Sequence, residues 1–556
     1  MESNSSIDKE CLKKEKELSK TMQRSKNIKL YFISRRTTSN SSLLKNQGSG
    51  VRYKYKRYSL PYDININNYD NITIDIIKEI DNIKTTINDL KSDLKFSQNK
   101  KWIISDELKE NLIKIRKELS KENIPKNKIK NILEHDIQNF VEILIELIEN
   151  ISEDYLIYEI LWILNNIIFF TAKINIIYLD SIKISNQISK IYLKQYKSNN
   201  EFKYSLLEKM HRIFGNLLFI NNKSIYSLIN NNIIVNIIES LIKPVASFRL
   251  ACLWLLNKIL IALKQNDDIN NYINLFINKF AIYNYNFIFA RLKNLEINEI
   301  SELFWLLCEL CKYDSNILIN IFFNGYQNQK NYSNILKNFD FVLNNCMTNK
   351  LSQISFRLIS NLLVIAYNDI NNEYLTTKFI ENFFEKKSVI LYINDVLNSP
   401  KNNYDISLVK DVLLLIFNLV CISSIKTSIY FKKGIVNLIS DNDYYTNKDI
   451  LKLLFIIFYK IIYYNTFNFE QNDDKVIKAC LITIKNFKND ENILILFIDI
   501  FYLYLISTKT PLDEELENEL NFIKKEKNIK IETYLNIFDK LSNIVKKASP
   551  LAQFLI

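Results

Sequence analysis

A tryptophan and an asparagine stand four residues apart in the apolar run YEILWILNNIIFF, as Trp162 and Asn166. Residues four apart project from one face of a helix, so these side chains are expected to lie side by side. An indole can wall a slot for a lysine stem, and its ring face attracts the ammonium by about 0.5–2 kcal/mol. A carboxamide can donate to and accept from the unpaired backbone of an extended peptide. The pair therefore suits binding of a basic, extended peptide.

The same pair has a structural alternative, because an unpaired buried amide costs about 1–3 kcal/mol. Asn166 is either satisfied inside the fold or part of a binding surface. Aligned repeats place these residues at one equivalent position: Trp162, Arg212, Trp254, Trp305, Arg357, Leu414 and Phe455. Four residues further on stand Asn166, Asn216, Lys258, Glu309, Asn361, Asn418 and Tyr459. The recurrence favours a row of binding positions over core packing alone.

Helices are the elements that must position this row. From Ser105 onward, apolar helices follow one another with short polar breaks, and related segments recur at 136–148, 230–242 and 432–440. A helical unit that recurs about every 40–50 residues is typical of a solenoid. The chain has only five glycines and six prolines, too few for the turns of sheets and hairpins. The sequence therefore predicts a large all-α protein.

The region before the solenoid is expected to contain a linker and one helix. Residues 37–71 hold two of the five glycines and resemble an unstructured linker. A series of apolar residues spaced by three and four then predicts a helix that caps the first repeat: Ile76, Ile80, Ile83, Ile87, Leu90 and Leu94. Ser105, followed by Asp106 and Glu107, predicts the start of the next helix.

The net charge of +12 is concentrated at the N-terminus. Residues 1–60 contain 15 basic and 5 acidic residues, whereas the rest of the chain contains 58 and 56. The basic segment is either a solvated tail or an arm that docks on an acidic partner. The charge is not accompanied by a recognisable nucleic-acid-binding fold, so specific nucleic-acid binding is not expected.

Other features argue against secretion, membrane insertion and catalysis. The seven cysteines form no disulfide framework, and the N-terminus lacks an apolar signal core. The longest apolar run, 493–507, has 15 residues against the ~20 that a membrane span needs. Phosphate-binding glycine motifs are absent, Cys308 and Cys311 have no second ligand pair, and the two histidines have no nucleophile signature. We expect a soluble intracellular protein that is not an enzyme and has no metal or cofactor.

Four segments resemble the third helix of armadillo repeats in the importin-alpha family: LWILNNI (161–167), MHRIFGNLL (210–218), CLWLLNKIL (252–260) and FRLISNLLV (356–364). Residues 115–144 also resemble the first repeat of that family, and residues 517–544 resemble its short last repeat. In that family the W-x-x-x-N pairs lie on the concave face and bind nuclear localisation signals. The resemblance implies a right-handed α-solenoid of about ten armadillo-like repeats with a flexible basic N-terminal arm.

The arm carries part of the resemblance. MQRSKNIKLYFISRRTTSNSSLLKNQ (22–47) resembles the segment of importin-alpha that binds importin-beta, with matched basic residues at Arg24, Lys26, Arg35, Arg36 and Lys45. The basic cluster that ends the segment in the family is missing here, and RYKYKR (52–57) is a candidate replacement. The implied organisation is a carrier-binding arm (1–58), a linker with a capping helix (59–104) and a solenoid (105–556).

The resemblance implies a nuclear import adaptor shared between cytoplasm and nucleus. Its implied partners are an importin-beta-type carrier, cargo proteins with basic signals and an export receptor for recycling, with no membrane. The implied cargo-binding residues are Trp162, Asn166, Asn216, Trp254, Trp305, Asn361 and Asn418. The pattern departs from the family at Arg212, Lys258 and Glu309, and at Ile220, where the family has a groove aspartate. These departures predict weaker or altered cargo binding.

Two other functions remain open. One is an armadillo scaffold that binds a different extended protein ligand and has no import function. The other is a basic protein that uses residues 1–60 on nucleic acid or an acidic membrane, with steep salt dependence.

Overall fold

Helices make up the regular structure of the residues that the computed structural model describes. These residues are 76–94, 102, 104–121, 126–174, 179–198, 202–266, 272–280, 295–311, 342, 349–368, 373–398, 404–440, 447–464, 474–526 and 528–548. No strand occurs among them. The all-α prediction is confirmed.

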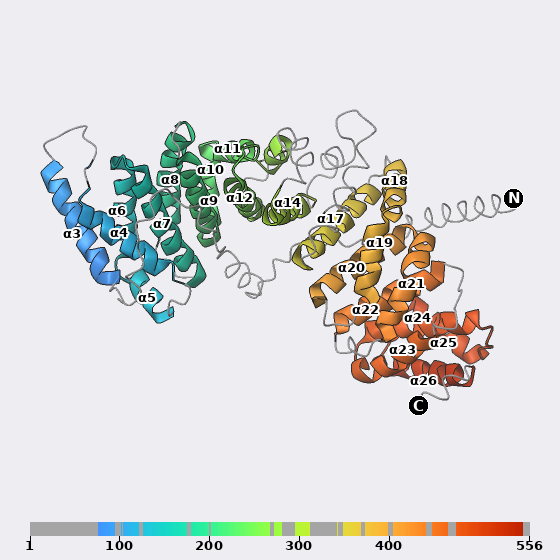
Figure 1. Cartoon of the computed structure of the whole chain (residues 1–556). Coiled ribbons are helices and arrows are strands. Elements are labelled where there is room, and N and C mark those ends of the chain that lie inside the picture. The colour runs from blue at the N-terminus through green and yellow to red at the C-terminus, as the bar shows by residue number, and fades with distance from the viewer. Residues whose placement is uncertain are drawn as a thin grey trace. The chain divides into compact units, whose positions relative to one another are not determined.

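The described helices belong to two units, one within Arg35–Asn338 and one within Phe339–Ile556 (Figure 1). The first contains α3 (Ile76–Leu94), α4 (Asp106–Leu119), α5 (Lys126–Glu134), α6 (Ile137–Asn150), α7 (Asp154–Ile174), α8 (Ser181–Tyr196), α9 (Lys203–Ile220), α10 (Ile225–Asn230), α11 (Ile233–Ser240), α12 (Ala246–Lys264) and α14 (Ile297–Leu310). The second contains α17 (Asn349–Asn368), α18 (Glu373–Phe384), α19 (Lys387–Asn398), α20 (Ile406–Ile422), α21 (Ser424–Ser440), α22 (Lys448–Tyr464), α23 (Asp474–Phe487), α24 (Glu491–Ser507), α25 (Glu514–Lys525) and α26 (Ile531–Ala548).

Each unit has one continuous series of long helices, which we call the ladder helices. In the first unit α4, α7, α9, α12 and α14 pack in that order, each against the next. In the second unit the series is α17, α20, α22, α24 and α26. A second layer covers each series, built from α6, α8, α10 and α11 in one unit and from α19, α21 and α23 in the other. Repeated units that contact mainly their neighbours define a solenoid, which confirms the fold class.

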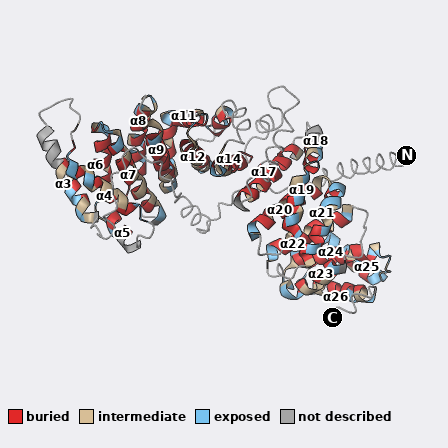
Figure 2. Cartoon of the chain, viewed as in Figure 1, coloured by how far each residue is buried: buried red, intermediate tan, exposed pale blue. Residues whose placement is uncertain are grey.

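Packing between two neighbours leaves the ladder helices mostly buried, as the burial colours in Figure 2 show. A narrow accessible stripe remains on α7 and α12, whereas α9 is buried throughout 206–215. In α7, Leu161, Ile163 and Leu164 are fully buried, whereas Trp162 and Asn166 are half-buried. Burying a Leu or Ile side chain stabilises a fold by about 1.5–3 kcal/mol, so this layer supplies much of the hydrophobic stabilisation. The stripe is where a ladder helix can meet a ligand.

Two ladder segments are long and apolar enough, by length and composition alone, to cross a membrane. They are Asp154–Lys173 in α7 and Ala246–Lys264, which is α12. In the structure 61% and 67% of their apolar windows are buried inside the protein. Burial between neighbouring helices accounts for this composition, because a core helix must be apolar on nearly every side.

The helix boundaries before the first repeat agree with the sequence. The Ser105 side chain accepts a hydrogen bond from the backbone N–H of Leu108 at 3.2 Å, so Ser105 caps α4 as predicted. The predicted apolar helix is present as α3. Its residues Ile80, Ile83 and Ile87 are buried, and the helix packs against α4 and α6.

Buried ion pairs connect successive ladder helices at three junctions. Arg116 Nε lies 2.6 Å from Glu159 Oε2 between α4 and α7. Arg249 makes two hydrogen bonds to Glu299, at 2.8 and 3.1 Å, between α12 and α14. Arg357 Nε lies 2.8 Å from Asp411 Oδ2 between α17 and α20. The acidic side chains are at most 4% exposed, so each pair fixes the register of two helices.

We predict that Glu299→Ala destabilises the first unit by about 3–5 kcal/mol, because it takes the carboxylate partner from the largely buried Arg249 guanidinium and the acceptor from the Glu296 N–H at the start of α14. The double variant Arg249→Met/Glu299→Leu should lose much less, since it removes both charges. The measurement is urea unfolding followed by circular dichroism.

The matched control is Asp449→Asn, which breaks the ion pair between Lys410 and Asp449 across α20 and α22. Asp449 is 65% exposed, so this change should cost less than about 1 kcal/mol. Equal losses for Glu299→Ala and Asp449→Asn would contradict a structural role for the buried pair.

Candidate binding face on the ladder helices

The three tryptophans predicted to bind a peptide belong to three ladder helices of the first unit. Trp162 lies in α7, Trp254 in α12 and Trp305 in α14, and each ring is half-buried in the accessible stripe of its helix. The fourth tryptophan, Trp102, precedes α4 and is not part of a ladder helix. The predicted register therefore places the indoles where a ligand can reach them.

Two cations of the chain itself already lie at the ring of Trp162. The Nζ of Lys209, from α9, is 3.8 Å from the ring centroid. The guanidinium carbon of Arg116, from α4, is 5.0 Å from it. The ring of Tyr158 meets Trp162 edge-on, with centroids 5.7 Å apart. The cation-binding capacity of this indole is thus in use within the fold.

Trp254 has a similar environment. The guanidinium carbon of Arg212 is 5.1 Å from its ring centroid, and Lys258 Nζ is 5.6 Å away. The ring lies directly against Gly215 of α9, where a Cβ atom would come within 2.1 Å of a ring carbon. Gly215 is therefore needed for this close approach of indole and helix. Arg212 and Lys258 are two of the departures from the family pattern, and both place a positive charge beside Trp254.

The amides of Asn166 and Asn216 are half-buried and donate to neighbouring ladder segments. Asn166 Nδ2 donates to Ser120 Oγ at 3.1 Å, at the end of α4. Asn216 Nδ2 donates to Asn165 Oδ1 at 3.2 Å, from α9 to α7. Both side chains are thus satisfied inside the fold while part of each stays accessible.

Asn361 and Asn418 occupy a different environment from the one expected of cargo-binding residues. Both are fully buried, and Asn418 Nδ2 donates to Ser360 Oγ at 2.8 Å. The structure places them in the packing between α17 and α20 and not in an accessible stripe, because these two helices lie close together. Glu309 is also buried, whereas Ile220 is half-buried at the end of α9.

Sequence reasoning missed two polar residues at the Trp162 ring and one buried amide, Asn257, between α12 and α14. Lys209 and Arg116 lie at the Trp162 ring, and Asn257 donates to the backbone oxygen and the Oε2 of Glu302, at 3.0 and 2.9 Å. Lys209 stands three residues before Arg212 and so shares its helical face, which was the available signal. Asn257 lies one residue outside the register and gave no signal.

In the second unit, tyrosines lie in the accessible stripes of α22 and α24, although the residue of α22 equivalent to the tryptophans is the buried Phe455. Tyr459 and Tyr463 of α22 are stacked, with ring centroids 5.7 Å apart, and Tyr502 of α24 is half-buried. Asp499, one turn before Tyr502, lies in the same accessible stripe. Burial raises the pKa of Asp499 to about 6, and Lys524 partly opposes the shift.

The arm residues Arg24, Lys26, Arg35, Arg36 and Lys45 lie outside the described residues, as do the linker residues before Ile76.

The two histidines have different environments: His211 lies in the core, and His135 Nε2 lies 2.9 Å from Asp81 Oδ1. His211 lies 3.3 Å from the Tyr192 hydroxyl and 3.6 Å from Cys252 Sγ, all in the core. Burial lowers the pKa of His211 to about 3 and raises the pKa of the Cys252 thiol, so both groups are neutral near pH 7. Cys308 and Cys311 are buried in and at the end of α14. No group of three or more His, Cys, Asp or Glu side chains within the described ranges could hold a metal ion.

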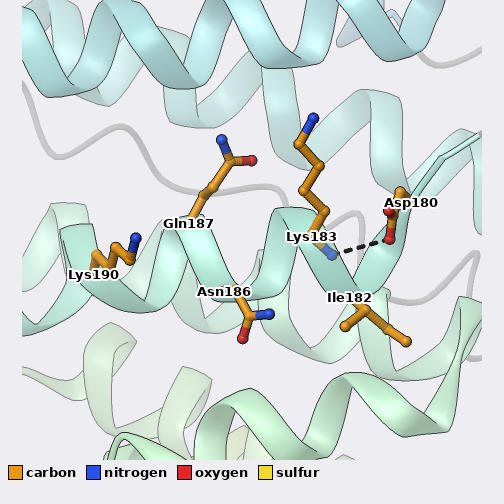
Figure 3. Close-up of a pocket in the computed structure, with 6 residues that line it drawn as sticks. All are labelled: Asp180, Ile182, Lys183, Asn186, Gln187 and Lys190. Carbon is orange, nitrogen blue, oxygen red and sulfur yellow. Dashed lines mark hydrogen bonds between the residues drawn. The ribbon is translucent and has the colours of Figure 1, made fainter.

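A pocket on α8 lies in the second layer, away from the ladder stripe (Figure 3). It is lined by Asp180, Ile182, Lys183, Asn186, Gln187 and Lys190. The backbone N–H of Lys183 donates to Asp180, and the Lys183 ammonium pairs with Glu142 at 2.8 Å. The lining groups thus serve the helix start and the contact with α6, and they do not extend the candidate face.

No protein-family model and no curated protein sequence matches this chain. Among solved structures, the chain is similar to an engineered protein from a structural genomics consortium, with a TM-score of 0.53 and 11% identity over 84% of this chain and 99% of the other. This likeness shows the fold alone.

Two further structures resemble the chain less closely. A designed armadillo repeat protein has a TM-score of 0.36 and 11% identity over 50% of this chain and 99% of its own. A structure from a study of cadherin and beta-catenin has a TM-score of 0.48 and 10% identity over 79% of this chain and 84% of its own.

The Lys209 ammonium at Trp162 is strongly desolvated, since the residue is only 6% exposed. Burial lowers the pKa of Lys209 to about 8; Arg212 and Arg116 add to the shift, and Glu208 and Glu159 oppose it. At pH 7 the group still carries its proton.

The lowered pKa of Lys209 predicts a pH-dependent stability. Between about pH 8 and 10 the unfolded chain keeps a proton that the folded chain has lost, so the contribution of Lys209 to the free energy of unfolding rises with pH. Lys209→Met should remove this rise. The measurement is the difference in free energy of unfolding between wild type and variant across this range. A constant difference would show that the Lys209 pKa is the same in both states.

Proposed function

We propose that this chain is a binding protein that takes an extended protein segment across the ladder face of α7, α9, α12 and α14. In its specific form, the proposal is an adaptor of the importin-alpha type, with a basic arm for an importin-beta-type carrier and a ladder face for cargo. Such an adaptor would move between cytoplasm and nucleus and would use an export receptor to return.

One observation carries the proposal. Three of the four tryptophans occupy the accessible stripe of ladder helices, although the rest of these helices is packed with aliphatic residues. These indoles are partly accessible, and tryptophan is enriched at binding hot spots. The partly accessible amides of Asn166 and Asn216 add groups that could meet a peptide backbone.

A second candidate is a scaffold for a different extended protein ligand. The cations at Trp162 and Trp254 favour this second candidate. A lysine-rich signal would approach rings that already have a cation of the chain beside them, namely Lys209, Arg212 and Lys258.

The arm separates the adaptor from its alternatives. Deleting residues 1–58 should abolish capture by an immobilised importin-beta-type carrier and leave peptide binding to the ladder face unchanged or stronger. A scaffold should be indifferent in both assays. A third outcome is that the chain binds DNA or acidic vesicles through residues 1–58 and that this binding falls steeply with salt. It would indicate a nucleic-acid-binding or membrane-binding function, because counterion release dominates such binding.

The ladder face is tested by Trp162→Ala and Trp254→Ala. Each should weaken binding of an extended peptide by about 2 kcal/mol, roughly 30-fold, if the indole is a hot spot. Trp102→Ala is the matched control, because it removes a half-buried tryptophan outside the ladder helices. The measurement is fluorescence anisotropy with labelled lysine-rich and glutamate-rich peptides, on variants whose helical content is intact. Equal effects of all three substitutions would reject this face as the binding site.

A further inference from the structure

Helix α9 lies between two tryptophan-bearing ladder helices and has no tryptophan of its own. Its anchor position is Arg212, which points a guanidinium at Trp254 of α12 at 5.1 Å. One turn earlier, Lys209 points its ammonium at Trp162 of α7 at 3.8 Å. One helix therefore supplies a cation to the indole on each side of it.

These cations are part of the packed structure. Lys209 and Arg212 are each 6% exposed, whereas the two indoles remain half-buried. Lys209 Nζ also lies 5.1 Å from the ring centroid of Tyr158, so two aromatic rings of α7 surround it. An ammonium held this way occupies the position in which a ligand lysine would gain its cation–π contact.

We propose that Lys209 is a specificity-determining residue, which fills the lysine position at Trp162 from within the fold and makes this face reject a ligand cation there. This inference rests on the proposed binding of an extended protein segment, and it favours the scaffold over the adaptor, whose cargo signals are basic. A ligand ammonium would be repelled by the ammonium of Lys209. It would also be repelled by the guanidinium of Arg116, which lies at the same Trp162 ring. The preferred segment has a neutral or acidic side chain at this point.

Lys209 can be replaced without breaking the neighbouring ion pair of Arg116 and Glu159. Glu159 keeps its ion pair with Arg116 at 2.6 Å, so the change does not leave that carboxylate alone. Methionine has a similar length and fits a site lined by rings. Arg212 is less suitable for a test, because the Trp254 ring beside it lies directly against Gly215.

The experiment compares three peptides of equal length that carry Lys, Gln or Glu at matched positions, titrated by fluorescence anisotropy. The proteins are the full-length wild type, Lys209→Met, Trp162→Ala and the double variant, with Lys209→Leu as a second neutral replacement. Lys203→Met is the control. Its ammonium also lies over an aromatic ring, that of Tyr196 of α8, at 5.4 Å.

Wild type should prefer the Gln and Glu peptides. Lys209→Met should bind the Lys peptide at least tenfold more tightly than wild type does, with little change for the Gln peptide. The gain should vanish when Trp162→Ala is added, and Lys203→Met should show none. If both Lys209 variants keep the wild-type preference for the Gln and Glu peptides, and wild-type binding still depends on Trp162, then Lys209 does not determine specificity. The proposed function would stand in that case. Absence of any Trp162-dependent binding in every protein would overturn the proposed function, and this inference with it.

Discussion

The structure depends on one constraint: each internal ladder helix is packed between two others and must bury nearly all of its surface. Such a helix has to be apolar almost all round, which is why α7 and α12 have the composition of membrane-spanning segments. Any polar side chain on the contact surfaces then needs a partner on the next helix, because a buried polar group without one is costly. The buried Arg249–Glu299 pair is one solution to this requirement.

The same constraint links packing to recognition. The accessible stripe of a ladder helix lies beside the junction with its neighbours, so its polar residues can serve both. Asn166 donates to Ser120, and Asn216 donates to Asn165, yet neither amide is fully buried. A tryptophan and an asparagine four residues apart can therefore stand either at a contact between two helices or at a binding position. The sequence pattern alone does not separate the two, because both uses require the same face.

What could be predicted from the sequence follows from local rules. Helical content, the cap at Ser105 and the exposed stripe with Trp162 and Trp254 all follow from spacing within one segment. The buried state of Asn361 and Asn418 depends instead on how closely α17 and α20 approach, which is a relation between segments more than 50 residues apart. The reach of Lys209 to the Trp162 ring is likewise an inter-helix property. The sequence therefore predicts the positions of the candidate side chains better than it predicts what they contact.

The two units offer different surroundings to a ligand cation. In the first unit, two of the indole rings already have a cation of the chain nearby. Lys209 lies at Trp162, and Arg212 and Lys258 lie at Trp254. In the second, Lys524 Nζ likewise lies 4.1 Å from the ring centroid of Tyr502, but the same stripe of α24 also carries Asp499, a carboxyl group that burial makes harder to ionise. A positive charge next to that carboxyl would favour its ionised form and be attracted by it, whereas a positive charge at Trp162 meets two others. The electrostatics of a shared architecture are thus set by which residue stands at each anchor position, as Arg212 in α9 and Trp254 in α12 illustrate.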